Sequence, residues 1–217
     1  MKIDSSIAAV VTGAASGLGE ATARMLAAQG ARVAVFDMQE DKGQAVAAQI
    51  GGVFCKVDVT DEASIDAGLK AARQAHGVER VLVNCAGVAP GRRIISRNRE
   101  TGALVAHDVA YFARGVAINL TGTFAMIAKC ATAMASLEPI DTDGQRGVII
   151  STASVAAEDG QIGQACYSAS KAGVQGMTLP IARDLAQYGV RVATILPGLF
   201  HTPMFDGLPD EARDSLA

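Results

Sequence analysis

The sequence predicts a single α/β domain, residues 1–217, built on a doubly wound parallel sheet with helices on both faces. Short, continuous apolar runs alternate with segments whose apolar residues recur at helical spacing, which is typical of strand–helix–strand units. A glycine-rich turn follows the first apolar run directly. The chain has 217 residues, 50% of them hydrophobic, which is enough for one substantial core.

Six strands are expected at the apolar runs, because a strand that helices cover on both sides is apolar on both faces. They lie at 7–11, 32–36, 53–57, 80–84, 148–151 and 190–196. The helices are expected between them, at 18–29, 40–50, 62–76, 104–135 and 167–187. Gly30 would end the first helix, since glycine readily adopts the left-handed conformation found after a helix C-terminus.

The composition argues against two classes of partner. A formal net charge of −3 provides no broad positive surface for nucleic acid or an anionic membrane. The apolar run at 7–11 is too short to span a membrane, and no signal-peptide cleavage pattern follows it. We therefore expect neither nucleic acid nor a membrane as a partner.

The cysteines and histidines are scattered rather than grouped. The cysteines show no Cys-x-x-Cys spacing and lie in apolar or helical contexts, at Cys55, Cys85, Cys130 and Cys166. The histidines are equally far apart, at His76, His107 and His201. We expect reduced, packed thiols, a reducing compartment such as the cytoplasm, and no metal site.

Residues 12–19, Thr-Gly-Ala-Ala-Ser-Gly-Leu-Gly, connect the first expected strand to the first expected helix. Glycines there let the backbone turn sharply and approach a ligand closely. The unpaired amides at the start of the helix form an anion site, for which a pyrophosphate is the natural ligand. Such turns also serve packing alone, but this strand–loop–helix context predicts a Rossmann-type nucleotide site with contacts from Gly13, Ser16, Gly17, Leu18 and Gly19.

Asp37 ends the second expected strand, eighteen residues after Gly19. That separation is close to the one expected for an acid that receives the hydroxyls of the adenosine ribose. A carboxylate accepts hydrogen bonds from hydroxyls and repels a phosphate, so NAD is favoured over NADP. A solvated aspartate at a strand end is the alternative.

Tyr167 and Lys171 are four residues apart in an expected helix and so project from nearly the same face. A free tyrosine titrates near ~10, too high for efficient proton exchange at neutral pH. A neighbouring ammonium lowers the free-energy cost of forming the phenolate. The two could be an ordinary surface pair, but behind a nucleotide site they predict a general acid/base.

These motifs resemble those of the short-chain dehydrogenase/reductase family over nearly the whole chain. Further motifs of that family follow in order, at Asn84-Cys85-Ala86-Gly87, Asn119, Ser154 and Pro197-Gly198. Cys85 departs from the asparagine usual at its position, which puts one local hydrogen bond in question. The segments 154–164 and 177–185 further resemble the type II 3-hydroxyacyl-CoA dehydrogenases, which oxidise 3-hydroxyacyl-CoA thioesters and some hydroxysteroids with NAD.

The resemblance implies a role for each matching residue. Tyr167 would be the general acid/base, Ser154 would hold and polarise the substrate oxygen, and Lys171 would bind the nicotinamide ribose and favour the phenolate. Asn119 would anchor a water for proton relay, although a helix-interior asparagine bonded to backbone is a serious alternative. Ser151 and Thr152 compete with Ser154, and the spacing to Tyr167 decides for Ser154. The implied NAD contacts beyond the glycine loop and Asp37 are Asp58, Val59, Asn84, Ala86, Gly87, Pro197, Gly198 and Thr202, with Tyr167 and Lys171.

The expected substrate is a small molecule, most specifically an acyl-CoA thioester. Apolar residues after the last strand would form a lid over it: Phe200, Met204, Phe205 and Leu208. A basic cluster could meet the phosphates of coenzyme A, although a solvated loop is favoured: Arg92, Arg93, Arg97 and Arg99. The resemblance also implies a homotetramer, formed in part through the helices at 104–135 and 167–187. Members of the family usually continue past the position of Ala217 with another helix and a final edge strand, which this sequence does not contain.

The sequence is compatible with three functions. The first is NAD-dependent oxidation of a secondary hydroxyl, with 3-hydroxyacyl-CoA as the preferred substrate. The second is an NAD-sensing protein without turnover, which would have no need of Ser154, Tyr167 and Lys171 together. The third is a 3-oxoacyl or steroid reductase of the same fold that uses NADPH, which Asp37 disfavours.

Overall fold

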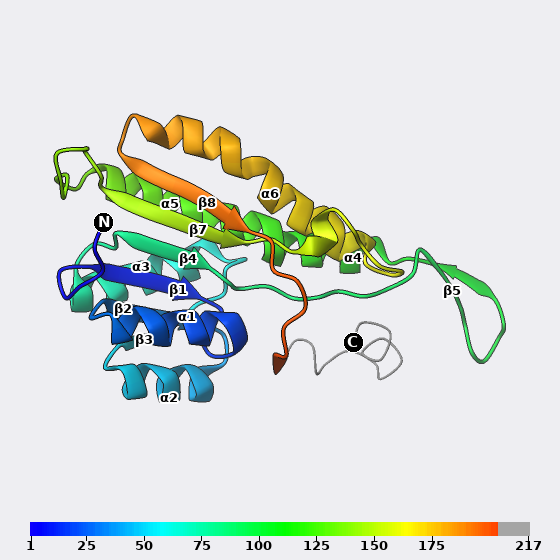
Figure 1. Ribbon diagram of the computed structural model, residues 1–217. Coiled ribbons are helices and arrows are strands. Elements are labelled where there is room, and N and C mark those ends of the chain that lie inside the picture. The colour runs from blue at the N-terminus through cyan, green and yellow to red at the C-terminus, as the bar shows by residue number, and fades with distance from the viewer. Residues whose placement is uncertain (204–217) are drawn as a thin grey trace.

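The computed structural model of the protein describes residues 1–203. A six-stranded, wholly parallel sheet runs in the order β3-β2-β1-β4-β7-β8. Its strands are β1 (Ala8–Thr12), β2 (Arg32–Asp37), β3 (Val53–Lys56), β4 (Val81–Asn84), β7 (Gly147–Thr152) and β8 (Val190–Ile195). This order reverses between β1 and β4, so the predicted doubly wound sheet is confirmed (Figure 1).

Helices cover both faces of the sheet (Figure 1). On one face lie α1 (Gly17–Ala28) and α2 (Glu40–Ile50), which enclose one apolar cluster with β1 and β2. On the other face lie α3 (Glu62–His76), α5 (Gly122–Ala135) and α6 (Ala165–Ala186), around a second cluster. The strands supply apolar side chains to both clusters, which is why their sequences are apolar runs rather than alternating patterns.

The predicted bounds of the two helices at 40–50 and 62–76 are those of the structure. Local capping explains the agreement. Gly51 follows α2 with φ 64°, the left-handed conformation that closes a helix at little cost for glycine. Asp61 begins α3 by accepting a hydrogen bond from the backbone N–H of Ala63 at 2.9 Å.

The helix expected at 104–135 was wrong at its start. Leu104–Ala106 forms a strand, β6, which pairs antiparallel with β5 (Ile95–Arg97). The connecting turn is built by Asn98, whose carbonyl accepts from the N–H of Gly102, itself at φ 69°. This hairpin extends beyond the rest of the domain in Figure 1, and both of its strands are exposed.

The helical stretch begins instead at α4 (Val109–Val116), where the Asp108 side chain accepts from the N–H of Ala110 at 2.8 Å. It passes through a π-helical turn, Ala117–Thr121, and continues as α5. The capping aspartate stops the helix from extending back into the β-branched and apolar residues before it. A π turn inside a long helix often marks a functional position.

The stretch Val109–Ala135 is long and apolar enough to cross a membrane by length and composition alone. Buried core helices pass the same test. In this fold Met126, Ile127 and Cys130 of α5 are buried in the core against the sheet. Packing within the domain therefore explains the apolar residues on the buried side of α5, whereas Val109 and Phe124 of the same stretch are exposed.

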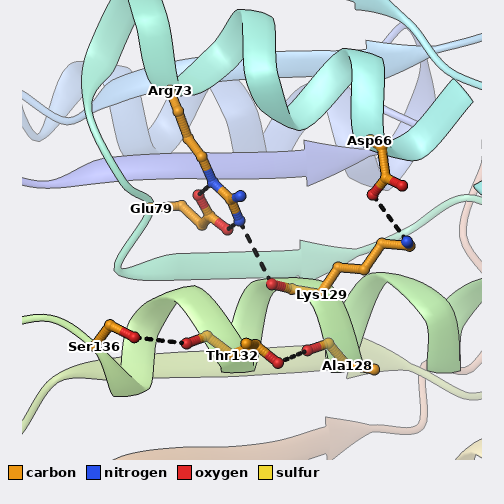
Figure 2. A network of polar contacts seen from close by, with 7 residues as sticks. All are labelled: Asp66, Arg73, Glu79, Ala128, Lys129, Thr132 and Ser136. Atoms are coloured by element: carbon orange, nitrogen blue, oxygen red, sulfur yellow. Dashed lines mark hydrogen bonds and ion pairs between the residues drawn. The ribbon is translucent and has the colours of Figure 1, made fainter. Parts of the chain in front are cut away.

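A buried ion pair joins α3 to the segment before β4 (Figure 2). The Arg73 guanidinium donates to both carboxylate oxygens of Glu79, at 3.0 and 2.7 Å, and to the carbonyl of Lys129 at 3.5 Å. The Glu79 side chain is only 2% exposed. Beside it, Lys129 reaches from α5 to Asp66 of α3 at 2.8 Å. These contacts tie α3 to α5 on the face that also carries α6.

Candidate active site

A cavity of about 830 Å³ lies where the carboxyl ends of the strands meet, and segments that follow β1, β2, β3, β4, β7 and β8 all line it. Crevices at this edge are where doubly wound domains bind their ligands. The structure brings most of the predicted site residues to its wall: Gly13, Ser16, Gly17, Leu18, Gly19, Asp37, Asp58, Val59, Ala86, Gly87, Ser154, Tyr167, Lys171, Pro197, Gly198 and Thr202. Asn84 and Asn119 lie outside that wall.

The glycine loop forms a cradle that side chains would fill. A Cβ on Gly13 would lie 2.7 Å from the backbone N of Ala86, and one on Gly19 would overlap the carbonyl of Gly13. Ser16 precedes α1 in an extended conformation and makes no side-chain cap hydrogen bond, so the first amides of the helix stay available. These features fit a pyrophosphate, and hence a dinucleotide, bound against the start of α1.

Asp37 stands at the end of β2 with its carboxylate held by backbone. One oxygen accepts from the N–H of Ala15 at 2.9 Å and the other from the N–H of Gln39 at 2.9 Å. The side chain is half-buried and lines the cavity. A negative charge is therefore fixed beside the glycine loop, where an adenosine ribose would lie.

Thr12, whose role the sequence analysis did not predict, joins the glycine loop to the segment after β4. Its hydroxyl oxygen accepts hydrogen bonds from the N–H groups of Cys85 and Ala86, both at 3.1 Å. Backbone N–H groups make these contacts, so cysteine in place of the usual asparagine does not break them. Burial raises the pKa of the Cys85 thiol, which keeps it a neutral, packed group in the cavity wall.

Asn84 lies behind the wall rather than in it. Its side-chain amide donates to Ser151 Oγ at 3.3 Å, and within residues 1–203 its Oδ1 has no hydrogen-bond partner. Its carbonyl accepts from the hydroxyl of Thr152. Both competitors of Ser154 are thus engaged with Asn84, and of the two only Thr152 joins Ser154 on the cavity wall.

Tyr167 and Lys171 both line the cavity from the first turns of α6. Lys171 Nζ lies 5.9 Å from the centroid of the Tyr167 ring and donates to the carbonyl of Thr152 at 2.7 Å. Burial lowers the pKa of Lys171 to about 8, opposed by the nearby Cys85 thiol. The lysine is thus fixed beside the tyrosine, and burial raises the free energy of its charged form.

Ser154 begins the 3-10 turn Val155–Ala157 and is 8% exposed. Its Oγ accepts from the N–H of Ala156 at 3.2 Å. A hydroxyl that accepts one hydrogen bond still has its own proton to donate. Ser154 can therefore donate to an oxygen atom of a ligand in the cavity.

Asn119 occupies the π turn, and its side chain is fully engaged. Its Oδ1 accepts from Val88 N at 2.8 Å, while its Nδ2 donates to Val88 O at 2.9 Å and to Ser170 Oγ at 3.0 Å. A Cβ on Gly87 would lie 3.1 Å from that Oδ1 and 3.6 Å from Lys171 Nζ. The side chain thus clamps the loop after β4 close to the lysine, as the structural alternative expected.

Several polar residues of the wall were not predicted: Arg114, Asp159, Gln161 and Gln164. Arg114 lies in α4, and the other three lie in the loop before α6, within the segment 154–164, where the resemblance assigned a role only to Ser154. Among the residues expected to contact substrate, Phe200 lines the cavity, whereas Met204, Phe205 and Leu208 lie outside the described residues. The basic cluster lies off the wall, and the Arg92 guanidinium instead stacks on the Tyr111 ring at 5.0 Å from its centroid.

Among residues 1–203 the cysteines form no disulfide, and the His, Cys, Asp and Glu side chains form no metal site. Cys55, Cys130 and Cys166 are buried and, like Cys85, form no disulfide. In residues 1–203 no group of three or more His, Cys, Asp or Glu side chains is arranged to hold a metal ion.

The chain matches known proteins over the same region. Residues 7–213 match the family model for short chain dehydrogenase. The chain is 52% identical over 210 residues to 3-hydroxyacyl-CoA dehydrogenase type-2 of Drosophila melanogaster, with 96% of this chain and 80% of that protein covered. The human protein of the same name is 48% identical over 213 residues, with 97% and 80% covered.

Solved structures of other proteins also superpose on this chain. The crystal structure of 3-hydroxyacyl-CoA dehydrogenase type-2 from Mycobacterium avium superposes with a TM-score of 0.86 at 38% identity, over 95% of this chain and 80% of that one. A 3-ketoacyl-(acyl-carrier-protein) reductase from Brucella melitensis, complexed with NADH, superposes with a TM-score of 0.82 at 31% identity. The superposition covers 96% of this chain and 82% of that one. The fold, the cavity and these matches agree that the chain belongs to the short-chain dehydrogenase family of oxidoreductases.

Proposed function

We propose that the protein is an NAD-dependent dehydrogenase that oxidises the hydroxyl of a 3-hydroxyacyl-CoA thioester. The observation that carries the proposal is the placement of Tyr167 and Lys171 on the wall of the cavity that the glycine loop also lines. The substrate class is supported by the names of the relatives in Drosophila melanogaster, human and Mycobacterium avium.

The cavity wall fits a dinucleotide along its length. The glycine loop, Gly13 with Ser16, Gly17, Leu18 and Gly19, would hold the pyrophosphate against α1. Asp37 would accept the ribose hydroxyls and repel a 2′-phosphate, which supports NAD over NADP. The remaining contacts are proposed for Asp58, Val59, Ala86, Gly87, Pro197, Gly198 and Thr202, with Asn84 supporting the floor from behind.

When bound, the nicotinamide would accept a hydride from the carbinol carbon of the substrate. Tyr167 would take the proton from the hydroxyl on that carbon, because a positive charge nearby lowers the free energy of its phenolate. Ser154 would donate a hydrogen bond to the same oxygen and so fix its position. Asn119 would act by holding Val88 with its side chain. Because that side chain is engaged, a water that relays protons would bind to the backbone of Asn119 instead.

Lys171 would contribute its charge and its position. Its bond to the carbonyl of Thr152 fixes the side chain, so the ammonium does not swing away from the Tyr167 ring. The other N–H groups of the ammonium remain for the nicotinamide ribose. With a pKa of about 8, Lys171 is mostly protonated at neutral pH.

We further propose that the enzyme is a homotetramer in a reducing compartment, the cytoplasm. Exposed apolar side chains occur on all three helices that would meet: Val109 of α4, Phe124 of α5 and Leu179 of α6. Light scattering should give four times the chain mass, and Phe124→Glu with Leu179→Glu should reduce it. A monomeric parent protein would contradict the tetramer and leave the catalytic proposal standing.

The function is tested by following reduced nicotinamide with NAD or NADP and a panel of 3-hydroxyacyl-CoA, hydroxysteroid and simple secondary alcohols. The proposal predicts the highest kcat/KM with NAD and a 3-hydroxyacyl-CoA, and a loss of roughly 10²–10³-fold in Ser154→Ala. NAD binding without turnover of any alcohol would favour the sensor. Preference for NADPH and an oxo substrate would favour the reductase.

A further inference from the structure

Arg114 is a cationic side chain of the cavity wall that has no partner among residues 1–203. It lies in α4, lines the cavity and is exposed. Its guanidinium forms no hydrogen bond or ion pair with the described part of the chain. The other cation on the described wall, Lys171, is bonded to the carbonyl of Thr152. The N–H donors of Arg114 are therefore available to a bound ligand.

The helix places Arg114 on the side of the cavity that the end of β3 forms. Arg114 and Ile118 are four residues apart on the helix, and both line the cavity. Ile118 packs against the apolar cluster that contains Val59. One turn later, a Cβ on Gly122 would lie 2.7 Å from Val59 Cγ2. Arg114, Ile118 and Gly122 therefore follow one side of the helix, which faces the segment after β3.

That side of the cavity is where the adenine of a dinucleotide would lie. Asp37, at the end of β2, is proposed to bind the adenosine ribose, and β3 is the next strand outward in the sheet. The described wall offers adenine no aromatic face there, because Phe36 is 1% exposed, whereas Tyr167 and Phe200 follow β7 and β8 in the other half of the sheet. A planar guanidinium stacks well on an aromatic ring, and the π electrons of the ring attract its charge.

We propose that Arg114 is a cofactor-binding residue whose guanidinium stacks on the adenine ring of NAD. The inference rests on the proposed function and deepens it, because it adds a contact to the adenine beyond those proposed for the pyrophosphate and the ribose. Asp58 lines the same side, but its carboxylate bonds the N–H and the hydroxyl of Thr60, at 2.9 and 2.7 Å, rather than the arginine. A contact to adenine involves no reacting atom, so Arg114 should act on NAD affinity and not on proton transfer by Tyr167.

Direct binding measurements on Arg114→Met test this. Methionine keeps a long, flexible side chain and removes the planar cation. The Kd for NADH, measured by isothermal titration calorimetry, should rise roughly 3–30-fold, the range expected for one cation–π contact. The Kd for reduced nicotinamide mononucleotide, which lacks the adenosine, should stay within about twofold of the parent. Because a stacked contact excludes water, the effect on NADH should persist at about 0.5 M salt, where attraction between an exposed arginine and a phosphate is screened.

Arg183→Met is the matched control, since Arg183 is an exposed arginine in the last turn of α6 and lies off the cavity wall. Thermal unfolding should be unchanged in both variants, because neither arginine has a side-chain partner in residues 1–203 to lose. An unchanged Kd for NADH in Arg114→Met, an equal loss for both ligands, or an effect that salt abolishes would overturn the inference and leave the dehydrogenase standing. A parent protein that binds NADH but oxidises no 3-hydroxyacyl-CoA would overturn the proposed function alone, since the Kd values require no turnover. A parent protein that binds no NADH would overturn both.

Discussion

Lys171 Nζ lies 5.9 Å from the centroid of the Tyr167 ring, one helical turn away and buried. The carbonyl of Thr152 holds it there at 2.7 Å. The same burial that fixes the ammonium also lowers its pKa to about 8 from the usual 10.5. The fold thus accepts a stability cost to keep a cation beside the phenol, and the cost is measurable.

The pH dependence of stability should reveal that cost. The folded pKa lies below the unfolded one, so between about pH 8 and 10.5 the unfolded state binds more protons. The stability of the parent should therefore rise over this window relative to Lys171→Met, by about 3 kcal/mol, and should stay level below it. Urea unfolding of both proteins measures the difference, in which the other titrating groups cancel. Parallel curves from pH 7 to 11 would show that the lysine is not buried as described.

Asp37 should control the choice of cofactor. In Asp37→Asn the negative charge is lost, while an amide oxygen remains to accept one of the two backbone N–H groups. The ratio of kcat/KM for NAD to that for NADP should fall by roughly tenfold or more, since about 1.4 kcal/mol of repulsion corresponds to that factor. Asp41→Asn, an exposed change in the first turn of α2, is the control. An unaltered ratio would mean that the carboxylate does not meet the ribose.

Asn119 should act mainly as a clamp. In Asn119→Ala the N–H and carbonyl of Val88 both lose their partner, which should lower the free energy of unfolding by about 1–3 kcal/mol. Thermal unfolding measures this, and KM for NAD should rise as the loop after β4 loosens. A variant with unchanged stability but a reduced kcat would favour a purely catalytic role in proton relay.

Removing Arg73 from the Arg73–Glu79 ion pair should destabilise the protein more than removing the charge of Glu79 (Figure 2). Glu79 is 2% exposed and Arg73 30%, so only the arginine can regain water when its partner is removed. Arg73→Met should therefore destabilise the protein by ~3 kcal/mol, more than Glu79→Gln does. The double variant Arg73→Met with Glu79→Met should recover much of the loss, because no buried charge is left alone. Equal effects of the two single changes would contradict this, as measured by urea unfolding.

Most of the sheet and several helix bounds could be predicted because local signals and tertiary packing agree there. The strands are apolar runs, and capping residues such as Asp61 and Gly51 mark the helix ends. The glycine loop and Asp37 were recognisable because both have fixed chemical requirements at a fixed spacing. Their positions on the cavity wall follow from the topology of a doubly wound sheet.

The missed features depend on contacts far apart in the sequence or on short segments. The hairpin of β5 and β6 has strands of three residues each, too short for a periodic pattern, and its apolar residues suit a helix as well. The clamp made by Asn119 joins residues 31 apart, and the hydroxyl of Thr12 acts across 73 residues.

The most direct measurement is the rate of NAD reduction by Tyr167→Phe with 3-hydroxybutyryl-CoA, compared with the parent. Phenylalanine keeps the ring beside Lys171 and removes only the hydroxyl that exchanges the proton. We predict a kcat lower by roughly 10²–10⁴-fold, with NAD binding and thermal stability retained. A variant that oxidises the thioester at the parental rate would contradict the role of this tyrosine as the proton acceptor.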